Sequence, residues 1–289
     1  MKRFLAGLFL LASLSTQAAF LNDGWDREAY NWQTNIVTSG GTLSASSYMT
    51  GTRFMNQVKQ WGVRPLLGRV GLYLGGETNA MLCPIINDWS GGGVINDDLI
   101  AFVAADYTEA TGLTGNTSTK YLRPSKAISL GLGSFTSIDN VHSAVYVRTA
   151  SNEASYCLGY ASAGNCSFGM PISFAGNTYI EINLVPVNDP VTDTNGVGFY
   201  ISTRLISGGT TNRTVYKNGA SLITTNVCNG NIGSGAVVVH AFNSAGSITA
   251  WTSRALSYYA FGYGIPAALV TPYRTAVRNV QIAKGRNVE

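Results

Sequence analysis

The carboxylates are the side chains in this sequence with the most chemistry to offer. A retaining glycosidase needs two carboxyl groups about 5 Å apart. Residues i and i+2 or i+4 of a strand can provide such a pair, because alternate side chains share one face. Glu181 lies in a strand-like segment, but Glu181-Ile182-Asn183-Leu184 contains no second acid. The sequence therefore predicts a polar, outward-facing Glu181 and no catalytic pair of carboxylates.

Two other acidic pairs, Asp97 with Asp98 and Asp106 with Glu109, fall in loops or at the beginning of strands. Acidic side chains in such places hydrogen-bond to the nearby backbone and stabilise turns. We therefore expect turn-capping carboxylates here rather than a general acid and a general base.

The chain has two histidines, His142 and His240, and neither has an HxH or HxxxH companion. A metal site needs several convergent ligands, so we expect His240 to be a rim residue with a local hydrogen bond. The sequence shows no Gly-x-Ser-x-Gly elbow, and Gly91-Gly92-Gly93 lacks the Lys-Ser/Thr of a phosphate loop. A Ser-His-Asp set that the fold assembles stays open as an alternative.

Three aromatic residues are candidates for contact with a ligand. Trp89, in the segment 87–91, is predicted to be an exposed loop aromatic. Tyr258 and Tyr263 lie near the Phe261-Gly262 bend, where exposed rings would stack on sugars, since an aromatic face combines apolar area with a polar tip. The alternative, which we favour, is that these tyrosines are buried and seal the edge of the fold.

The four cysteines are Cys83, Cys157, Cys166 and Cys228, and none of them forms a CxxC pair. Cys157 and Cys166 flank a segment with Gly and Asn residues, and a hairpin there would bring their sulfurs together. If the chain is secreted, we predict this bridge, which would stabilise the fold by roughly 2–3 kcal/mol. The alternative is four buried thiols.

The amino-acid composition excludes some classes of binding partner and favours others. Charged residues make up 12 % of the chain and the net charge is +4, whereas an average domain is about 25 % charged. No Lys/Arg cluster forms a track for phosphates, so nucleic-acid binding is not expected. A surface of Ser, Thr, Asn and Gly suits an extracellular or particle-bound protein and the polar loops that contact sugars.

Residues 1–19 have the order of a secretory signal. Lys2 and Arg3 precede the apolar run 4–14, and the small residues that follow predict cleavage after Ala18 or Ala19. The alternative is an apolar N-terminal arm that is buried in an assembly. The run is too short to span a bilayer, which takes about 20 residues.

Residues 20–76 read as a helical region. We expect one helix over 22–36, capped by Asn22 or Asp23, a second beginning at Ser46 or Ser47 and ending at residue 59, and a short third one from Pro65. The predicted apolar stripes of the first two are Ala29, Trp32 and Ile36, then Phe54, Met55 and Val58.

Residues 77–289 read as strands separated by turns. Candidate strands are 99–104, 143–148, 156–160, 178–184, 197–202, 214–217, 237–241 and 249–259. Turn dipeptides such as Asn218-Gly219 tolerate the positive φ of tight hairpins. Because no crossover helices separate the strands, an all-β sandwich or jelly roll is predicted. A last helix is expected to begin at Pro272 and to be anchored by Val277, Val280 and Ile282.

Several motifs occur in an order that one family shares. They lie at 106–116, 118–122, 145–149, 216–219, 242–262, 273–277 and 285–287, after a helical preamble at 39–42 and 54–69. Over these stretches the chain resembles the concanavalin A-like (LamG-like) jelly-roll proteins common in bacteriophage genomes, which are often virion or tail-associated. The resemblance implies an all-β jelly-roll β-sandwich, preceded by a short helical region and closed by a C-terminal helix.

The resemblance also implies a site for calcium at the rim of the sandwich. Asp189 and Asp193, in the loop 187–195, would supply oxygen ligands. The alternative is a polar hairpin loop that holds no metal. No other cofactor is expected.

The motifs, together with the missing catalytic set, predict a non-enzymatic, phage-type virion structural or surface protein, with host glycans as a candidate ligand. Its partners would be other virion proteins or further copies of itself, and its location the virion. The leader-like residues 1–19 support an alternative, a secreted bacterial carbohydrate-binding protein or a glycoside hydrolase or lyase.

Overall fold

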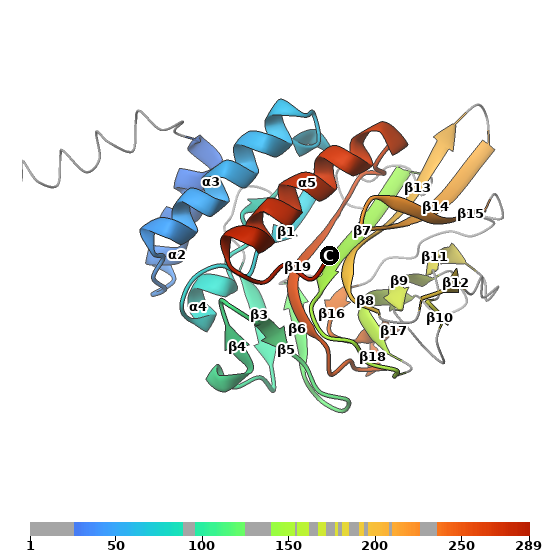
Figure 1. The fold of residues 1–289 in the computed structure, drawn as a ribbon. Helices are drawn as coiled ribbons and strands as arrows, with labels where there is room; N and C mark the ends of the chain where they lie inside the picture. The colour runs from blue at the N-terminus through green and yellow to red at the C-terminus, as the bar shows by residue number, and fades with distance from the viewer. Residues whose placement is uncertain are drawn as a thin grey trace, which may run out of the picture.

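A computed structural model describes residues 26–88, 96–124, 140–153, 155–161, 167–171, 177–178, 181–184, 191–193, 196–207, 210–225 and 236–289. Two β-sheets pack face to face, and helices cover the outer face of one of them (Figure 1). The predicted β-sandwich, with helices before it and a helix at its end, is confirmed. Among the helices in these ranges, none is long and apolar enough to cross a membrane.

The larger sheet contacts the helices on one face and the smaller sheet on the other. Its strands follow the order β15–β14–β13–β7–β19–β1–β2, and β5, paired with β4, attaches to β19. β7 lies between β13 and β19 and is antiparallel to both. The bounds, in the order named, are Ala220–Thr225, Thr210–Lys217, Gly198–Ser207, Asn140–Val147, Ala255–Gly262, Leu67–Gly71, Ile86–Asn87, Gly112–Thr114 and Tyr107–Thr108.

The smaller sheet follows the order β11–β9–β8–β16–β6–β3, and the hairpin of β17 and β18 attaches to β8. A separate ribbon pairs β10 with β12. The bounds, in the order named, are Glu181–Leu184, Ser167–Pro171, Tyr156–Ala161, Val238–Val239, Tyr121–Pro124, Asp97–Ile100, Phe242–Ser244, Ser247–Thr249, Asn177–Thr178 and Val191–Thr192.

Alternate residues of the central strands face two different cores, as the two-residue repeat of a strand requires. On β7, Ala144 and Tyr146 belong to the core beneath the helices, whereas Val145 and Val147 belong to the core between the two sheets. Both faces of this strand are therefore buried. This explains why its sequence lacks the polar alternation of a half-exposed strand.

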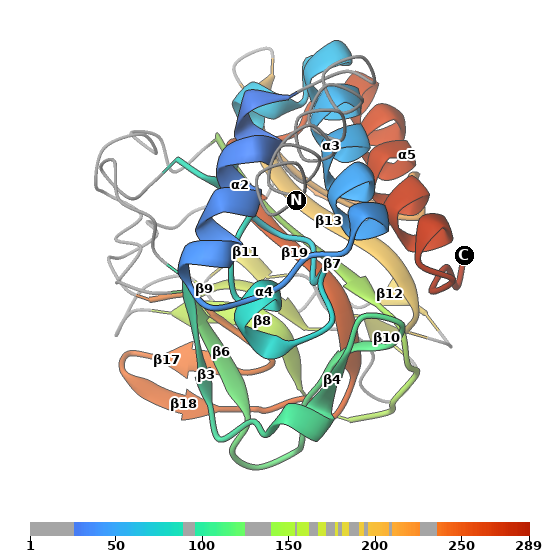
Figure 2. The same cartoon turned by 90° about the vertical axis from the view of Figure 1, so that its left-hand side faces the viewer.

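Three helices form the layer over the larger sheet (Figure 2). They are α2 (Arg27–Thr38), α3 (Ala45–Gln60) and α5 (Ala267–Ala283), while the short α4 (Thr78–Met81) follows β1. Asp26 caps α2, because its carboxylate accepts hydrogen bonds from two backbone N–H groups of the first turn. Both predicted apolar stripes are buried, as the amphipathic pattern indicated, but the predicted caps are wrong, because α2 begins after Asp26 and α3 after Ser44, whose side chain accepts a first-turn N–H.

The third predicted helix does not form, and the predicted C-terminal helix forms with a different start. After Pro65 the chain makes only a 3-10 turn, η1 (Arg64–Leu66), and then enters β1, because that segment pairs with β19 and β2. The last helix begins at Ala267, so Pro272 lies inside it. Val277 and Val280 are buried as expected, but Ile282 is 49 % exposed and anchors nothing.

The close approach of β19 to β1 provides a test of this packing. A Cβ on Gly262 would lie 2.0 Å from the Leu66 carbonyl oxygen, whereas a Cβ on Gly76 would meet nothing within 4 Å. Because backbone cannot move aside like a flexible side chain, Gly262→Ala should lower the free energy of unfolding by about 2–3 kcal/mol. Urea denaturation measures the change, and Gly76→Ala is the control. Equal effects of the two substitutions would contradict this packing.

Candidate functional site

The described Asp and Glu side chains form ion pairs or hydrogen bonds with other residues of the fold. Apart from Glu77, which accepts a hydrogen bond from Thr42, each Asp or Glu whose side chain is described pairs with a Lys or an Arg. The described residues therefore offer no free pair of carboxylates for acid–base work. They also contain no group of three or more His, Cys, Asp and Glu side chains that could hold a metal.

Asp97 and Asp106 illustrate two kinds of structural carboxylate. Asp106 caps a turn as predicted, because its Oδ2 accepts the Val103 N–H at 2.7 Å. Asp97 does not, because β3 places it inside the sandwich, where it pairs with Arg69 and accepts the Tyr259 hydroxyl at 2.5 Å. Burial raises the pKa of Asp97, and the charge of Arg69 only partly opposes this. The turn-capping prediction is therefore wrong for Asp97.

The predicted aromatic candidates do not meet in one place. Tyr258 is fully buried beneath the helices, and its hydroxyl lies 2.6 Å from that of Tyr273. It cannot stack on a ligand, so the burial that we favoured is observed for this residue, but β19 lies between β7 and β1 and not at an edge of the sheet. Tyr263 is half-buried, and Trp89 lies outside the described residues.

The predicted bridge and the calcium site both depend on residues outside the described ranges. Cys166, the expected partner of Cys157, is one of them, and so is Asp189. The Cys157 side chain is buried, and burial raises the pKa of its thiol to about 12. Asp193 is also buried; its carboxylate pairs with Lys217 at 2.6 Å and accepts a hydrogen bond from Tyr200. The bridge and the calcium site stay predictions.

Both histidines are completely buried. The rim position predicted for His240 is wrong, because the Phe102 ring from another loop covers its imidazole, with the two ring centroids 5.5 Å apart. Neither ring nitrogen of His240 has a hydrogen-bond partner among the described residues. Burial lowers the pKa of His240 to about 3 and that of His142 to about 4. Both imidazoles are therefore neutral structural residues at neutral pH.

Among the described residues, a crevice between α3 and α5 is a candidate site for a ligand. Its volume is about 220 Å³. Residues of α3 line one wall and residues of α5 the other, and the two helices lie side by side in both ribbon views (Figure 1, Figure 2). The lining residues are Thr50, Arg53, Phe54, Gln57, Asn279, Val280 and Ala283.

The crevice combines apolar side chains with amide side chains. Phe54 and Val280 are buried, whereas Gln57 and Asn279 are half-buried. The Gln57 Oε1 atom is buried and accepts no hydrogen bond from the protein. A buried acceptor without a donor costs about 1–3 kcal/mol; a rotation of the Gln57 side chain that brought its amide to the surface of the crevice would let a ligand hydroxyl recover that cost.

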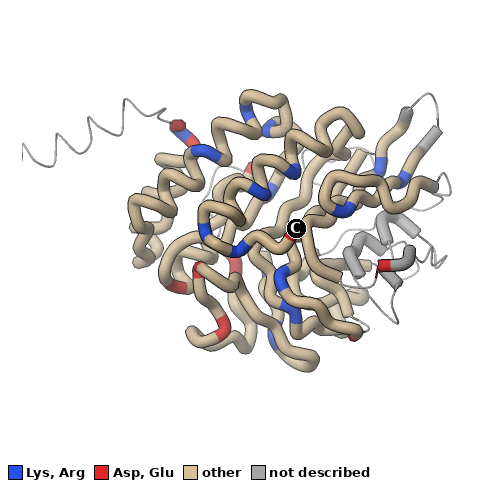
Figure 3. Tube along the Cα trace, viewed as in Figure 1, with Lys and Arg blue, Asp and Glu red and all other residues tan. Residues whose placement is uncertain are grey.

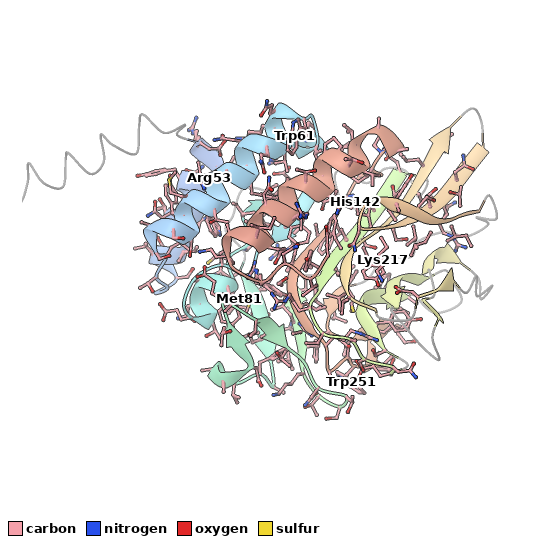
Figure 4. All side chains as sticks on the ribbon, in the orientation of Figure 1. Arg53, Trp61, Met81, His142, Lys217 and Trp251 are labelled. Atoms are coloured by element: carbon pink, nitrogen blue, oxygen red, sulfur yellow. The ribbon has the colours of Figure 1, made fainter. Side chains whose placement is uncertain are left out.

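Arg53 supplies the positive charge of the crevice (Figure 4). Its side chain is exposed, and within the described ranges it forms no hydrogen bond or ion pair. Neither α3 nor α5 contains an Asp or a Glu, although both contain cations (Figure 3). The local field at the crevice therefore favours negative charge.

The sequence indicates only one of the two walls of this crevice. Arg53 and Gln57 are four residues apart in an acid-free helix, so their sharing of one face was readable. The opposite wall comes from Asn279 in α5, near the other end of the chain. No local pattern shows that these two helices become neighbours, and the crevice was missed for that reason.

No family model and no curated protein matches the chain. Solved structures are similar to it in fold. The CBM40 of Ruminococcus gnavus IT-sialidase bound to alpha2,3 sialyllactose is 12 % identical, with a TM-score of 0.38, over 46 % of this chain and 81 % of that chain. A SAP-like pentraxin from Limulus polyphemus is 13 % identical, with a TM-score of 0.33, over 46 % of this chain and 68 % of that one.

A larger protein is similar over more of the chain. Trypanosoma rangeli sialidase, in complex with 2,3-difluorosialic acid, is 11 % identical, with a TM-score of 0.47, over 73 % of this chain and 32 % of that one. The predicted all-β sandwich is borne out by the two packed sheets of the structure, and membership of the concanavalin A-like family stays a prediction. At these identities the likeness concerns the fold alone, and the link with phage proteins stays a prediction.

Proposed function

We propose that this protein is a non-enzymatic binding module whose crevice between α3 and α5 holds a sugar residue. The supporting observation is the lining, with Gln57 and Asn279 above an apolar base of Phe54 and Val280. A sugar presents matching surfaces, because hydroxyls surround its edge while C–H groups form its faces. Ligand sites generally combine an apolar lining with a few placed polar groups in this way.

The size of the crevice sets the size of the ligand. Pockets for drug-sized ligands measure about 300–1,000 Å³, and this one is about 220 Å³. It has room for one sugar residue and not for a chain of them. A glycan would then be recognised by a terminal or a protruding residue, with the rest of it outside the crevice.

The proposal is non-enzymatic because the crevice offers no general acid or base. None of its lining residues is an Asp, Glu, His, Lys, Cys or Tyr. An arginine stays protonated at neutral pH and cannot exchange a proton there. The crevice can bind and orient a ligand, but its described residues have no means of breaking a glycosidic bond.

A glycan array followed by titration calorimetry tests this function. Gln57→Leu removes the buried acceptor and should weaken binding of the best array ligand by roughly tenfold, about 1.4 kcal/mol. Gln60→Leu makes the same change at an exposed position of α3 that does not line the crevice, and it should leave binding unchanged. If the folded protein binds no glycan, or if the two substitutions have equal effects, the proposal is wrong.

The biological setting is a separate part of the proposal. The ordered motifs support a phage particle, in which the module would contact host glycans, whereas Lys2, Arg3 and the apolar run 4–14 support secretion. Mass spectrometry of purified particles decides the first, and N-terminal sequencing after expression with residues 1–19 decides the second. Absence from particles together with an uncleaved Met1 would exclude both settings.

A further inference from the structure

We propose that the ligand of the crevice carries a negative charge, as a carboxylate or a sulfate group on its sugar, and that Arg53 binds this group. Because this ligand class deepens the proposed function, it stands only if the crevice binds a sugar at all. Three properties of the described residues support it: the state of Arg53, the charges of the two helices, and the position of the amides.

Arg53 differs from the other cations of α3 and of α5 and its cap. Lys59, Arg274, Arg278 and Lys284 pair with carboxylates at 2.6, 2.7, 3.6 and 3.3 Å. Arg53 has no such partner within the described ranges. Its neighbours one helical turn away, at positions 49, 50, 56 and 57, are Met, Thr, Asn and Gln, so its own helix supplies no carboxylate. The guanidinium therefore keeps its full charge and its planar set of donors for a ligand.

The amides lie where the rest of an acidic sugar would need them. Arg53 and Gln57 are four residues apart on α3 and share one face, and Asn279 reaches the same crevice from α5. With its anionic group on Arg53, the sugar would present its hydroxyls to the amide side chains of Gln57 and Asn279, which line the same crevice. A neutral sugar can form hydrogen bonds with the Gln57 amide, but the Arg53 guanidinium then stays in contact with water alone.

Charge sets the size of the expected preference. A hydrogen bond to an ionised group is roughly twice as strong as one between neutral groups, and the pair at Arg53 forms at an exposed edge where salt screens it. We expect an acidic sugar to bind about tenfold more tightly than its neutral counterpart at low salt. The preference should shrink as the salt concentration rises.

Two matched pairs of ligands test the charge and separate its sources. Glucuronic acid is compared with glucose, and galactose 6-sulfate with galactose, by NMR titration of the full chain at about 50 and 500 mM salt. Preference for either acidic member, with shifts at residues 50–57 and 279–283, supports the proposal. Equal binding of the neutral and acidic members would overturn it and leave the proposed function standing. No shifts in the crevice with any sugar, or with the best array ligand, would overturn both.

Substitutions on the protein complete the test. Arg53→Gln should abolish the preference by weakening binding of the acidic sugar about tenfold, whereas Arg53→Lys should retain part of the preference. Arg27→Gln removes the same charge from an exposed position of α2 that does not line the crevice. If Arg27→Gln reduces the preference as much as Arg53→Gln does, the general charge of the protein is responsible and the proposal fails.

Discussion

Arg286→Met should lower the free energy of unfolding by about 3–5 kcal/mol, measured by urea denaturation at neutral pH. The Arg286 side chain is completely buried. Its guanidinium donates to four backbone carbonyls at 2.7 to 3.2 Å and to the Gln281 Oε1 at 2.7 Å. The carbonyls belong to Leu72, Tyr73, Glu109 and Ser257.

The size of this effect follows from what the substitution leaves behind. Methionine fills a similar volume with an adaptable apolar chain, so the main loss is of hydrogen bonds and not of packing. Several buried acceptors would lose their donor, and each such acceptor costs about 1–3 kcal/mol. Part of that cost is recovered because the buried charge of Arg286 is itself removed; burial lowers the pKa of this guanidinium to about 10.

Arg123→Met is the matched control for this prediction. Arg123 pairs with Asp98 at 2.9 Å, but both side chains are 48 % exposed. An ion pair in contact with water contributes little to stability, so this substitution should change the unfolding free energy by less than about 1 kcal/mol. A loss at Arg286 no larger than the loss at Arg123 would show that the C-terminal segment does not hold β19, the end of β1 and the turn between β4 and β5 together.

The features that the sequence predicted well are those that short segments determine by themselves. Asn218 and Gly219 have φ angles of +50° and +82°, the backbone that a tight hairpin turn needs. They join β14 to β15, where Lys217 pairs with Ala220. The amphipathic stripes of α2 and α3 were also readable, because each lies within a single helix.

The features that the sequence missed depend on segments that are distant along the chain. β1 follows Pro65, which suits a first helical turn, but pairing with β19 decides its conformation. His240 comes at the end of an apolar strand, and the sequence of that strand does not show whether its last residue is covered. The ring that covers the His240 imidazole is Phe102, from another loop. Arg286 was part of a recognised tail motif, yet nothing local indicated that it would donate to carbonyls of three other segments. The crevice belongs to the same class, since its walls come from both ends of the chain.

Lowering the pH from 7.5 to 5.0 should reduce the free energy of unfolding by about 4 kcal/mol through the two histidines. Burial lowers the pKa of both imidazoles, to about 4 for His142 and about 3 for His240. The Tyr263 carbonyl opposes the shift of His142, and the charge of Glu153 opposes that of His240, but burial is the larger effect.

The sign follows from which state binds protons. An imidazole in the unfolded chain has a pKa of about 6.5. Between pH 6.5 and pH 4 the unfolded state therefore gains protons that the folded state does not, and stability falls as the pH falls. Each histidine contributes about 1.4 kcal/mol per pH unit inside this window, or about 2 kcal/mol between pH 7.5 and pH 5.0.

Removing both imidazoles separates this effect from the titration of carboxylates. The chain contains only two histidines, so a variant with His142→Gln and His240→Asn has none; asparagine tolerates the φ of +68° at position 240. The lowered pKa values of Glu28, Glu109 and Glu153 act mainly below about pH 5, where unfolded glutamates begin to protonate. The free energy of unfolding of the double variant should therefore be nearly constant between pH 5.0 and 7.5, and each single variant should show half of the wild-type slope. A double variant that keeps the full slope would contradict the assignment of this effect to the histidines.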